Sequence, residues 1–215
     1  MIDYSLYVIT NRDLQRNRST FEVVEGVIRG GATIIQLREK NLSTRVFFEN
    51  ALTIRKITKR AGIPLIINDR MDIALAVNAD GIHLGEEDLP LKYARKIAPH
   101  LIIGYSADSV LDAQLAEKYG ADYLGVGSVF TTATKVDAGP AIGIQRLEEI
   151  KKAVSIPVVA IGGINLANLP EVIQAGVDGV AVVSAIVADA SPFRAAKRFR
   201  LTIDSLRKEK HVNPN

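Results

Sequence analysis

Three polar side chains alternate along one short segment, and their types suit the binding of an anion. Gln36, Arg38 and Lys40 are separated by single residues in Gln36-Leu37-Arg38-Glu39-Lys40. In an extended strand every second side chain points to the same face, so these three would project together. Two cations and an amide on one face can bind phosphate oxygens. A solvated rim would also be polar but would not need this alternation, and we therefore predict a binding site here.

Two aspartates that follow apolar runs are candidate metal ligands. Asp69 ends Ile67-Asn68-Asp69, and Asp88 ends the acidic run Glu86-Glu87-Asp88. One or two carboxylates, completed by substrate oxygens and water, are typical of Mg²⁺ sites. Strict strand alternation would turn Asn68 and Asp69 to opposite faces, so a role for both requires a local twist. The acidic run also fits a solvent-facing loop, and within it we favour Asp88 as the ligand.

Glycines and hydroxyl groups later in the chain predict a phosphate site. Gly162-Gly163 allows backbone N–H groups to approach a ligand closely, and Val183-Ser184 can add donors where a helix begins. The hydroxyl-rich segment Thr132-Ala133-Thr134-Lys135 can reach phosphate oxygens and close over a site. The alternatives are turn glycines without a ligand and an ordinary exposed loop. We favour phosphate because the two glycine and serine turns follow consecutive apolar runs.

The other reactive residue types restrict the chemistry. Cys is absent, which excludes disulfides, thiolate metal sites and a cysteine nucleophile. No Ser-His-Asp arrangement can be read from the sequence. His83 lies within the apolar segment Gly81–Gly85, where a hydrogen-bonded core histidine is at least as plausible as a catalytic one. The role of His83 therefore stays open.

The composition describes a globular protein large enough to bury such a site. The chain has 215 residues, of which 47% are hydrophobic and 24% charged, and a formal net charge of +3. These values are unlike those of disordered chains and suit one domain. With 6% aromatics and no Trp there is little to stack on single-stranded nucleic acid, so we expect phosphorylated small molecules as partners and no nucleic acid. No membrane-length apolar run and no signal-peptide pattern are present, and we expect a cytoplasmic protein without membrane contact.

Short β-branched runs alternate with longer segments of helical period, which predicts parallel strands connected by helices. Apolar residues recur three and four apart in the segments Val46–Arg60, Val110–Tyr119, Gln145–Val154 and Leu169–Ala175. The expected strands are Leu6–Thr10, Thr33–Leu37, Pro64–Asn68, Gly81–Leu84, Leu101–Ser106, Tyr123–Val126, Pro157–Ile161 and Gly179–Val183.

A four-residue phrase recurs where the expected helices lead into strands, at residues 31–34, 78–81, 120–123 and 176–179. Its first residue is Gly or Asn, which suits a left-handed helix C-cap, and a short polar residue then leads into the strand. Repeated units of this kind could build an open doubly wound sheet or a closed barrel.

The residues after the first expected strand favour the barrel. They read Thr10-Asn11-Arg12-Asp13 and lack the G-x-G-x-x-G turn of a nucleotide-binding sheet. We therefore predict a single α/β domain over residues 1–215, a (β/α)8 TIM barrel whose chemistry lies at the C-terminal ends of its strands. The basic segment Arg194–Lys210 predicts a helix that covers the barrel, followed by a frayed tail from about residue 208 to 215.

These residues together resemble the thiamin phosphate synthase family, from Leu6 to about Ala188. The resemblance implies a (β/α)8 barrel that joins a hydroxymethylpyrimidine diphosphate to a thiazole phosphate, with Mg²⁺, and releases pyrophosphate. The matching segments are Gln36–Lys40, Ile67–Arg70, Asp80–Gly85, Thr132–Lys135, Ala160–Ile164 and Gly179–Ser184.

The resemblance also implies a role for each matching residue. Asp69 and Asp88 fall on the magnesium ligands of the family. Arg38, Lys40, Ser106 and Lys135 are expected to act on the reaction itself. The pyrimidine diphosphate site falls on Gln36, Arg38, Lys40, Asn68, Ser106 and Lys135, and the thiazole phosphate contacts fall on Thr132, Thr134, Gly163, Val183 and Ser184.

Three alternatives to this activity remain, of which the most distant is another phosphate-binding barrel of amino-acid biosynthesis. A related thiazole tautomerase would bind a thiazole phosphate on a similar barrel, but would not require Arg38, Asp69, Asp88 and Lys135 together. A barrel that only binds thiamin precursors would have a broken catalytic set, which this sequence does not show. The sequence leaves open whether the chain forms a homo-oligomer. It also leaves open whether the thiazole substrate carries an extra carboxylate.

Overall fold

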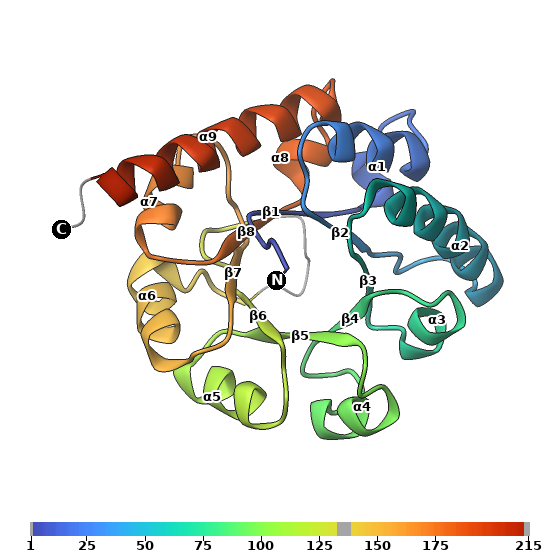
Figure 1. The fold of residues 1–215 in the computed structure, drawn as a ribbon, viewed down its shortest axis with the longest axis horizontal. Coiled ribbons are helices and arrows are strands. Elements are labelled where there is room, and N and C mark those ends of the chain that lie inside the picture. The colour runs from blue at the N-terminus through green and yellow to red at the C-terminus, as the bar shows by residue number, and fades with distance from the viewer. Residues whose placement is uncertain (1, 133–138, 213–215) are drawn as a thin grey trace.

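The centre of the molecule is a closed barrel of eight parallel strands, which confirms the predicted fold. The structure is a computed structural model that describes residues 2–132 and 139–212, with side chains as far as residue 209. Each strand pairs with the next one along the chain, and β8 pairs with β1 to close the ring, which Figure 1 shows from one end. The strands are β1 (Leu6–Ile9), β2 (Ile34–Leu37), β3 (Leu65–Asn68), β4 (Gly81–Leu84), β5 (Ile102–Ala107), β6 (Tyr123–Val126), β7 (Val158–Ile161) and β8 (Gly179–Val182).

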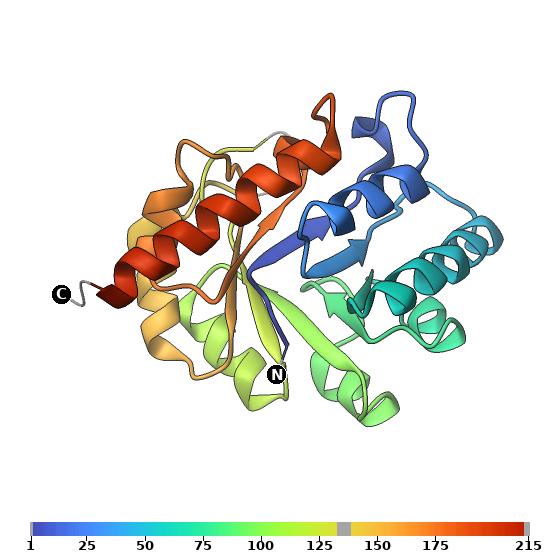
Figure 2. The same ribbon diagram turned by 45° about the horizontal axis from the view of Figure 1, so that its top comes forward.

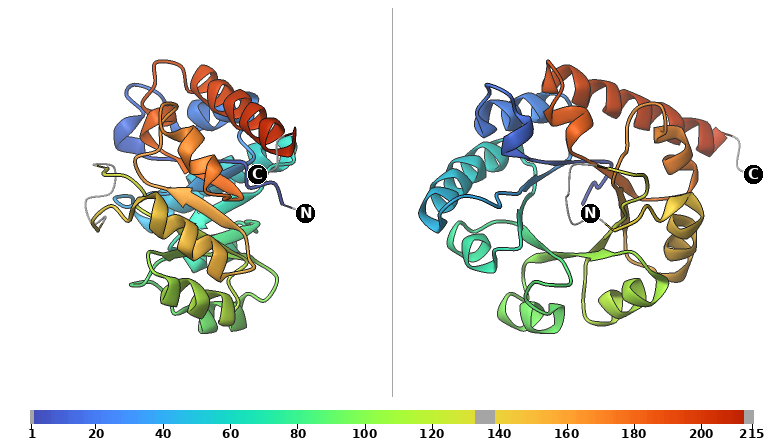
Figure 3. Two further views of the ribbon diagram at one scale, coloured as in Figure 1. Left: turned by 90° about the vertical axis from the view of Figure 1, so that its left-hand side faces the viewer. Right: turned by 180° about the vertical axis from the view of Figure 1, so that it is seen from behind.

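Helices form an outer ring around the strands (Figures 1 and 3). The long last helix, α9, crosses the outside of the barrel and packs against α1 and α7 (Figure 2). Within the described residues no helix has the length and apolar composition needed to cross a bilayer. The helices are η1 (Arg12–Leu14), α1 (Thr20–Arg29), α2 (Thr44–Ala61), α3 (Met71–Ala76), α4 (Leu91–Ile97), α5 (Val110–Lys118), α6 (Gly143–Ala153), α7 (Leu169–Gln174), α8 (Ser184–Val187) and α9 (Pro192–Val212).

Alternate residues of each strand enter two different apolar layers. Leu6 and Val8 of β1 pack outward in the layer between strands and helices, which also contains Phe199 of α9. Tyr7 and Ile9 of the same strand point into the barrel. Because strand side chains alternate between faces, the pairing register decides which residues line the interior. The interior layer also contains Tyr4, Ile34, Ile66, Tyr123, Val159 and Ala181.

The recurring phrase ends helices as the sequence predicts. Its first residues, Gly31, Asn78, Gly120 and Gly176, have φ values of 98°, 51°, 93° and 83°. These left-handed conformations follow α1, α3, α5 and α7, where glycine or asparagine is favoured because other side chains are strained.

The third residue of the phrase ties neighbouring strands together. The Asp80 carboxylate accepts a hydrogen bond from the Leu65 N–H at 2.8 Å and pairs with Arg55 at 2.5 Å. Each such bond joins the start of an odd-numbered strand to the residue that precedes the next strand, so it holds the pair in register. Asp122 and Asp178 bind the N–H groups of Ile103 and Val158 and pair with Arg95 and Lys151, and Thr33 binds the N–H of Leu6.

The element boundaries agree closely with the sequence prediction except at the C-terminus. All strand ends lie within one residue, and the ends of the four named helical segments lie within two. The sequence places a frayed tail from about residue 208, whereas in the structure α9 continues to Val212. Arg207 anchors these last turns by donating hydrogen bonds to the Ser5 hydroxyl and the Asp178 carbonyl. Residues 213–215 lie outside the described part of the chain.

Removal of one inter-strand tie should measurably destabilise the barrel. Asp80→Ala leaves the Leu65 N–H without its acceptor and Arg55 without its carboxylate. An unsatisfied donor of this kind costs about 1–3 kcal/mol, which we expect as the loss in the free energy of unfolding measured by urea denaturation. The control is Glu148→Ala, which removes an exposed 3.6 Å pair with Lys152 and should change stability by less than about 1 kcal/mol. Equal losses in the two variants would contradict the role of Asp80.

Candidate active site

One cavity at the C-terminal ends of the strands collects the predicted site residues. Its volume is about 580 Å³. Every predicted residue that the structure describes lines it, whereas Thr134 and Lys135 lie outside the described residues. The residues brought together are Gln36, Arg38, Lys40, Asn68, Asp69, Asp88, Ser106, Thr132, Gly163, Val183 and Ser184.

A left-handed residue explains how Asn68 and Asp69 share this cavity. Asn68 is the last residue of β3, and Asp69 follows it with φ of 62°. This conformation, which aspartate tolerates better than most side chains, interrupts the alternation of the strand. The turn is held by the Asp69 N–H, which donates to the His83 carbonyl at 2.9 Å. The local twist that a shared role requires is therefore present.

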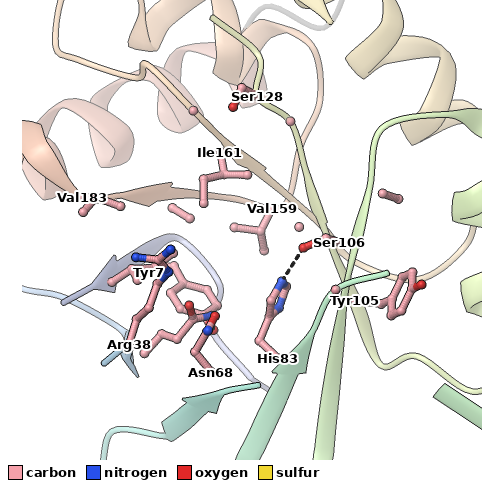
Figure 4. A pocket seen from close by; sticks show the side chains of 18 of the residues that line it. Tyr7, Arg38, Asn68, His83, Tyr105, Ser106, Ser128, Val159, Ile161 and Val183 are labelled. Carbon is pink, nitrogen blue, oxygen red and sulfur yellow. Dashed lines mark hydrogen bonds between the residues drawn. The ribbon is translucent and has the colours of Figure 1, made fainter. Parts of the chain in front are cut away.

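Lys40 and Arg38, the two cations of the alternating triplet, differ in whether they pair with a carboxylate. Lys40 forms a 2.6 Å ion pair with Asp69. Arg38 is half-buried, lines the cavity, and makes no ion pair or side-chain hydrogen bond within the described residues. Figure 4 shows its guanidinium beside the cavity, near Tyr7 and Asn68. An uncompensated cation in a partly buried site favours an anionic ligand.

Asp69 and Asp88 lie close enough to affect each other. Burial raises the pKa of the Asp88 carboxyl, and the neighbouring Asp69 carboxylate raises it further, whereas the Gly85 N–H and the Lys40 ammonium oppose the increase. The Gly85 N–H donates to Asp88 Oδ2 at 2.7 Å. Two carboxylates that repel each other can be neutralised by a divalent cation, and two protein carboxylates are a normal set for Mg²⁺. Within residues 2–132 and 139–209 no cluster of three or more His, Asp or Glu side chains is arranged to hold a metal.

The glycine pair after β7 is required by packing as well as by any ligand. Gly162 and Gly163 have φ values of 100° and 67°. A Cβ on Gly162 would lie 2.6 Å from Ser128 Cβ, and one on Gly163 would lie 2.7 Å from Phe130 Cβ. The loop after β6 therefore packs directly on this turn. The steric role accounts for the glycines by itself, so the phosphate role depends on their position at the cavity.

Three side chains with rings meet inside the barrel. The role of His83 was left open from the sequence, and Tyr7 and Tyr123 were not predicted as site residues. His83 of β4 hydrogen-bonds Ser106 through Nε2 and Tyr123 through Nδ1, each at 3.0 Å, and Figure 4 marks the bond to Ser106. Tyr123 in turn contacts the Tyr7 hydroxyl at 2.8 Å. The inward alternation of their strands could have placed Tyr7 and Tyr123 inside the barrel, but not their mutual contact.

Comparison with known proteins agrees with the fold. Residues 6–186 match the family model described as thiamine monophosphate synthase. A thiamine-phosphate synthase of Chloroflexus aurantiacus is 50% identical over 203 residues, which cover 94% of each chain. One from Moorella thermoacetica is 50% identical over 208 residues, which cover 96% of this chain and 99% of the relative.

A solved structure is similar to this chain in both fold and sequence. The thiamine phosphate pyrophosphorylase of Pyrococcus furiosus superposes with a TM-score of 0.89 at 45% identity, over 95% of this chain and 98% of that chain. A 3-hexulose-6-phosphate synthase, at 20% identity and a TM-score of 0.67, shares the fold.

The raised pKa of Asp88, caused first by burial and then by the Asp69 carboxylate, has a consequence for stability. Because its pKa is raised in the folded state, the folded protein holds this proton more tightly than the unfolded chain does. The contribution to stability is therefore present at low pH and lost as the pH rises through the raised pKa. Asp88→Asn keeps an oxygen for the Gly85 N–H and should raise the urea midpoint at pH 7. The gain should shrink as the pH falls through the raised pKa and be absent below pH 3.8, the ordinary value for Asp. Asp108→Asn, an exposed change at the same cavity, is the control. A less stable Asp88→Asn protein at pH 7 would refute the repulsion.

Proposed function

The chain belongs to the thiamine monophosphate synthase family, and on that premise we propose that it joins a pyrimidine to a thiazole with displacement of pyrophosphate. The substrates are a hydroxymethylpyrimidine diphosphate and a thiazole phosphate, and the product is thiamin phosphate. This is transferase chemistry of thiamin biosynthesis. The observation that best supports it is a single cavity that brings together a close carboxylate pair, a glycine turn and a guanidinium that pairs with no carboxylate among the described residues.

The basic end of the cavity suits the diphosphate. Arg38 presents a forked set of donors that match phosphate oxygens, and it has no competing carboxylate among the described residues. Lys40 pairs with Asp69, and with Mg²⁺ held by that carboxylate its ammonium would be available to a phosphate oxygen. We assign the diphosphate to Arg38 and Lys40, with Gln36, Asn68 and Ser106 around the pyrimidine. Lys135 is assigned to the same group, although it lies outside the described residues.

Asp69 and Asp88 would hold Mg²⁺. Their donor set is hard oxygen, and their mutual repulsion is what a divalent cation relieves. When bound, Mg²⁺ supplies positive charge that stabilises the departing pyrophosphate. The residues of the chain position that charge, because both carboxylates border the cavity into which Arg38 also points.

The residues that follow β6, β7 and β8 suit the thiazole phosphate. Gly163, Val183, Ser184 and Thr132 line the cavity, and Ser184 is the first residue of α8. Backbone N–H groups at turns and helix starts bind phosphate well. Thr134 is assigned here with Thr132, outside the described residues.

The chemistry requires no covalent nucleophile and no strong base. The reacting carbon is attached to an electron-rich aminopyrimidine, whose ring can delocalise positive charge, so the diphosphate can leave before the thiazole nitrogen attacks. The chain has to stabilise the leaving group and exclude water from the cation. Anchoring the thiazole by its phosphate holds the nitrogen near the carbon, and such positioning can contribute about 7–11 kcal/mol at most.

A pyrophosphate-release assay tests the reaction class. The purified protein is mixed with both substrates and Mg²⁺, and each component is then omitted in turn. We expect release only in the complete mixture, because the leaving group needs the metal and the cation needs its acceptor. Isomerisation of the thiazole phosphate alone would instead indicate a tautomerase, and binding without turnover would indicate a precursor-binding barrel.

Substitution of Asp69 tests the metal site. Asp69→Asn is preferred to Asp69→Ala because asparagine tolerates the observed φ of 62°. Loss of this charge should lower the Mg²⁺-dependent kcat by roughly 10²–10³-fold, as removal of one electrostatic group often does, while the unfolding midpoint stays close to that of the wild type. Asp108→Asn at the same cavity serves as the matched control and should keep its turnover. Normal turnover of Asp69→Asn would remove Asp69 from the site.

A further inference from the structure

Five polar side chains from five strands form one unbroken hydrogen-bonded relay across the barrel. Gln36 of β2 donates from Nε2 to the Tyr7 hydroxyl of β1 at 2.9 Å, and Tyr7 meets the Tyr123 hydroxyl of β6 at 2.8 Å. Tyr123 meets His83 Nδ1 of β4 at 3.0 Å, and His83 Nε2 meets the Ser106 hydroxyl of β5 at 3.0 Å. The proposed metal and phosphate contacts do not explain why Tyr7, Tyr123 and His83 are present.

The Gln36 end favours one direction along the relay, because its amide nitrogen can only donate. The amide nitrogen of Gln36 donates to the oxygen of Tyr7, and a phenol has a single hydrogen, which Tyr7 then directs to Tyr123. In the same sense Tyr123 would donate its own hydrogen to His83 Nδ1, the role of which depends on the tautomer. An imidazole that accepts at Nδ1 carries its hydrogen on Nε2, from which it donates to Ser106.

The tyrosines are suited to hold this direction. Tyr7 and Tyr123 are each only 1% exposed. Burial raises the pKa of both phenols above the ordinary value, so neither becomes a phenolate that could accept from both sides. A buried phenol that turned its hydrogen away from this row would also leave a polar group unsatisfied, at a cost of about 1–3 kcal/mol.

Two glycines make room for the rings to meet. Gly104 of β5 pairs in register with both His83 and Tyr123, and a Cβ there would overlap the Tyr123 ring and lie 2.5 Å from His83 Nδ1. A Cβ on Gly125, the register partner of Ser106, would lie 2.9 Å from His83 Cε1. Neither glycine has a left-handed φ. Because glycine weakens a strand, its presence at both positions is explained by the space that the relay needs.

We propose that the relay fixes the hydrogen-bonding sense of the cavity, with Tyr7, Tyr123 and His83 as positioning residues. Ser106, which receives a hydrogen from His83, directs its own hydrogen into the cavity and presents a donor to a ring nitrogen of the substrate. Gln36 commits its amide nitrogen to Tyr7, so its oxygen, which accepts no hydrogen bond within the described residues, is left for an amino group. An aminopyrimidine carries both features, and this identification of the ligand rests on the proposed function.

The tautomer of His83 tests the relay without any ligand or turnover. The chain has three histidines, so nitrogen-15 NMR of histidine-labelled protein resolves few imidazoles, and His83→Phe assigns the signal of interest. We expect the wild-type protein at pH 8 to hold His83 as the neutral form with hydrogen on Nε2. Tyr123→Phe should weaken this preference, because it removes the donor to Nδ1. A wild-type His83 with its hydrogen on Nδ1 would overturn the proposal.

Kinetics test the consequence for recognition. Tyr123→Phe should raise the KM for the pyrimidine diphosphate by roughly 3–10-fold, the value of one hydrogen bond, and change the KM for the thiazole phosphate much less. Tyr4→Phe is the matched control. The ring centroids of Tyr4 and Tyr123 are 5.1 Å apart, but the Tyr4 hydroxyl is outside the relay. Equal increases for both substrates, or a fall in kcat alone, would show a merely structural role and refute the proposal.

The two experiments separate this inference from the proposed function. If the wild type fails the pyrophosphate-release assay while His83 shows the expected tautomer, the activity is wrong and the relay stands. If the wild type turns over and the tautomer is reversed, the relay is wrong and the activity stands.

Discussion

The pairing register of the barrel is the constraint on which the site depends. Because side chains alternate along a strand, a slip of one residue would exchange the interior set for the exterior set. The register is held at the N-terminal ends of the strands, where Asp80 and its counterparts bind backbone N–H groups of the neighbouring strand. With that register, Gln36, Asn68 and Ser106 all open into the cavity at the other end. Stability and chemistry thus occupy opposite ends of the same strands.

The interior changes in polarity along the barrel axis. Ile34 and Ile66, near the N-terminal ends of β2 and β3, are apolar and lie outside the cavity lining. Above them lies a layer of uncharged polar groups that are hydrogen-bonded to one another, and above that layer the charged residues Arg38, Asp69 and Asp88 border the mouth. This order follows from the cost of burial, because neutral groups can be satisfied inside by one another whereas charges need solvent, a partner or a ligand. A ligand with an uncharged heterocycle at one end and a charged phosphate at the other would match this order of polarity.

Some parts of the site could be predicted from the sequence and others could not. The alternation of Gln36, Arg38 and Lys40 indicates a shared face, and the structure places all three at one cavity. Strand alternation alone would have separated Asn68 from Asp69, and only the left-handed turn at Asp69 reunites them. The glycine pair was interpreted through a ligand, whereas the structure adds a packing reason in Ser128 and Phe130.

The sequence by itself determined the elements, their order and their ends. Helix caps, strand alternation and the four-residue phrase that recurs before β2, β4, β6 and β8 are local signals that act over a few residues. It also determined that polar and charged groups follow the strands. Only the tertiary structure decided that Asp69 lies close enough to Asp88 to raise its pKa, and that Tyr7 meets Tyr123 across 116 positions of sequence. Those contacts depend on barrel closure and on the space that Gly104 of β5 leaves for the Tyr123 ring. No local pattern encodes a distance between strands that are far apart in the chain.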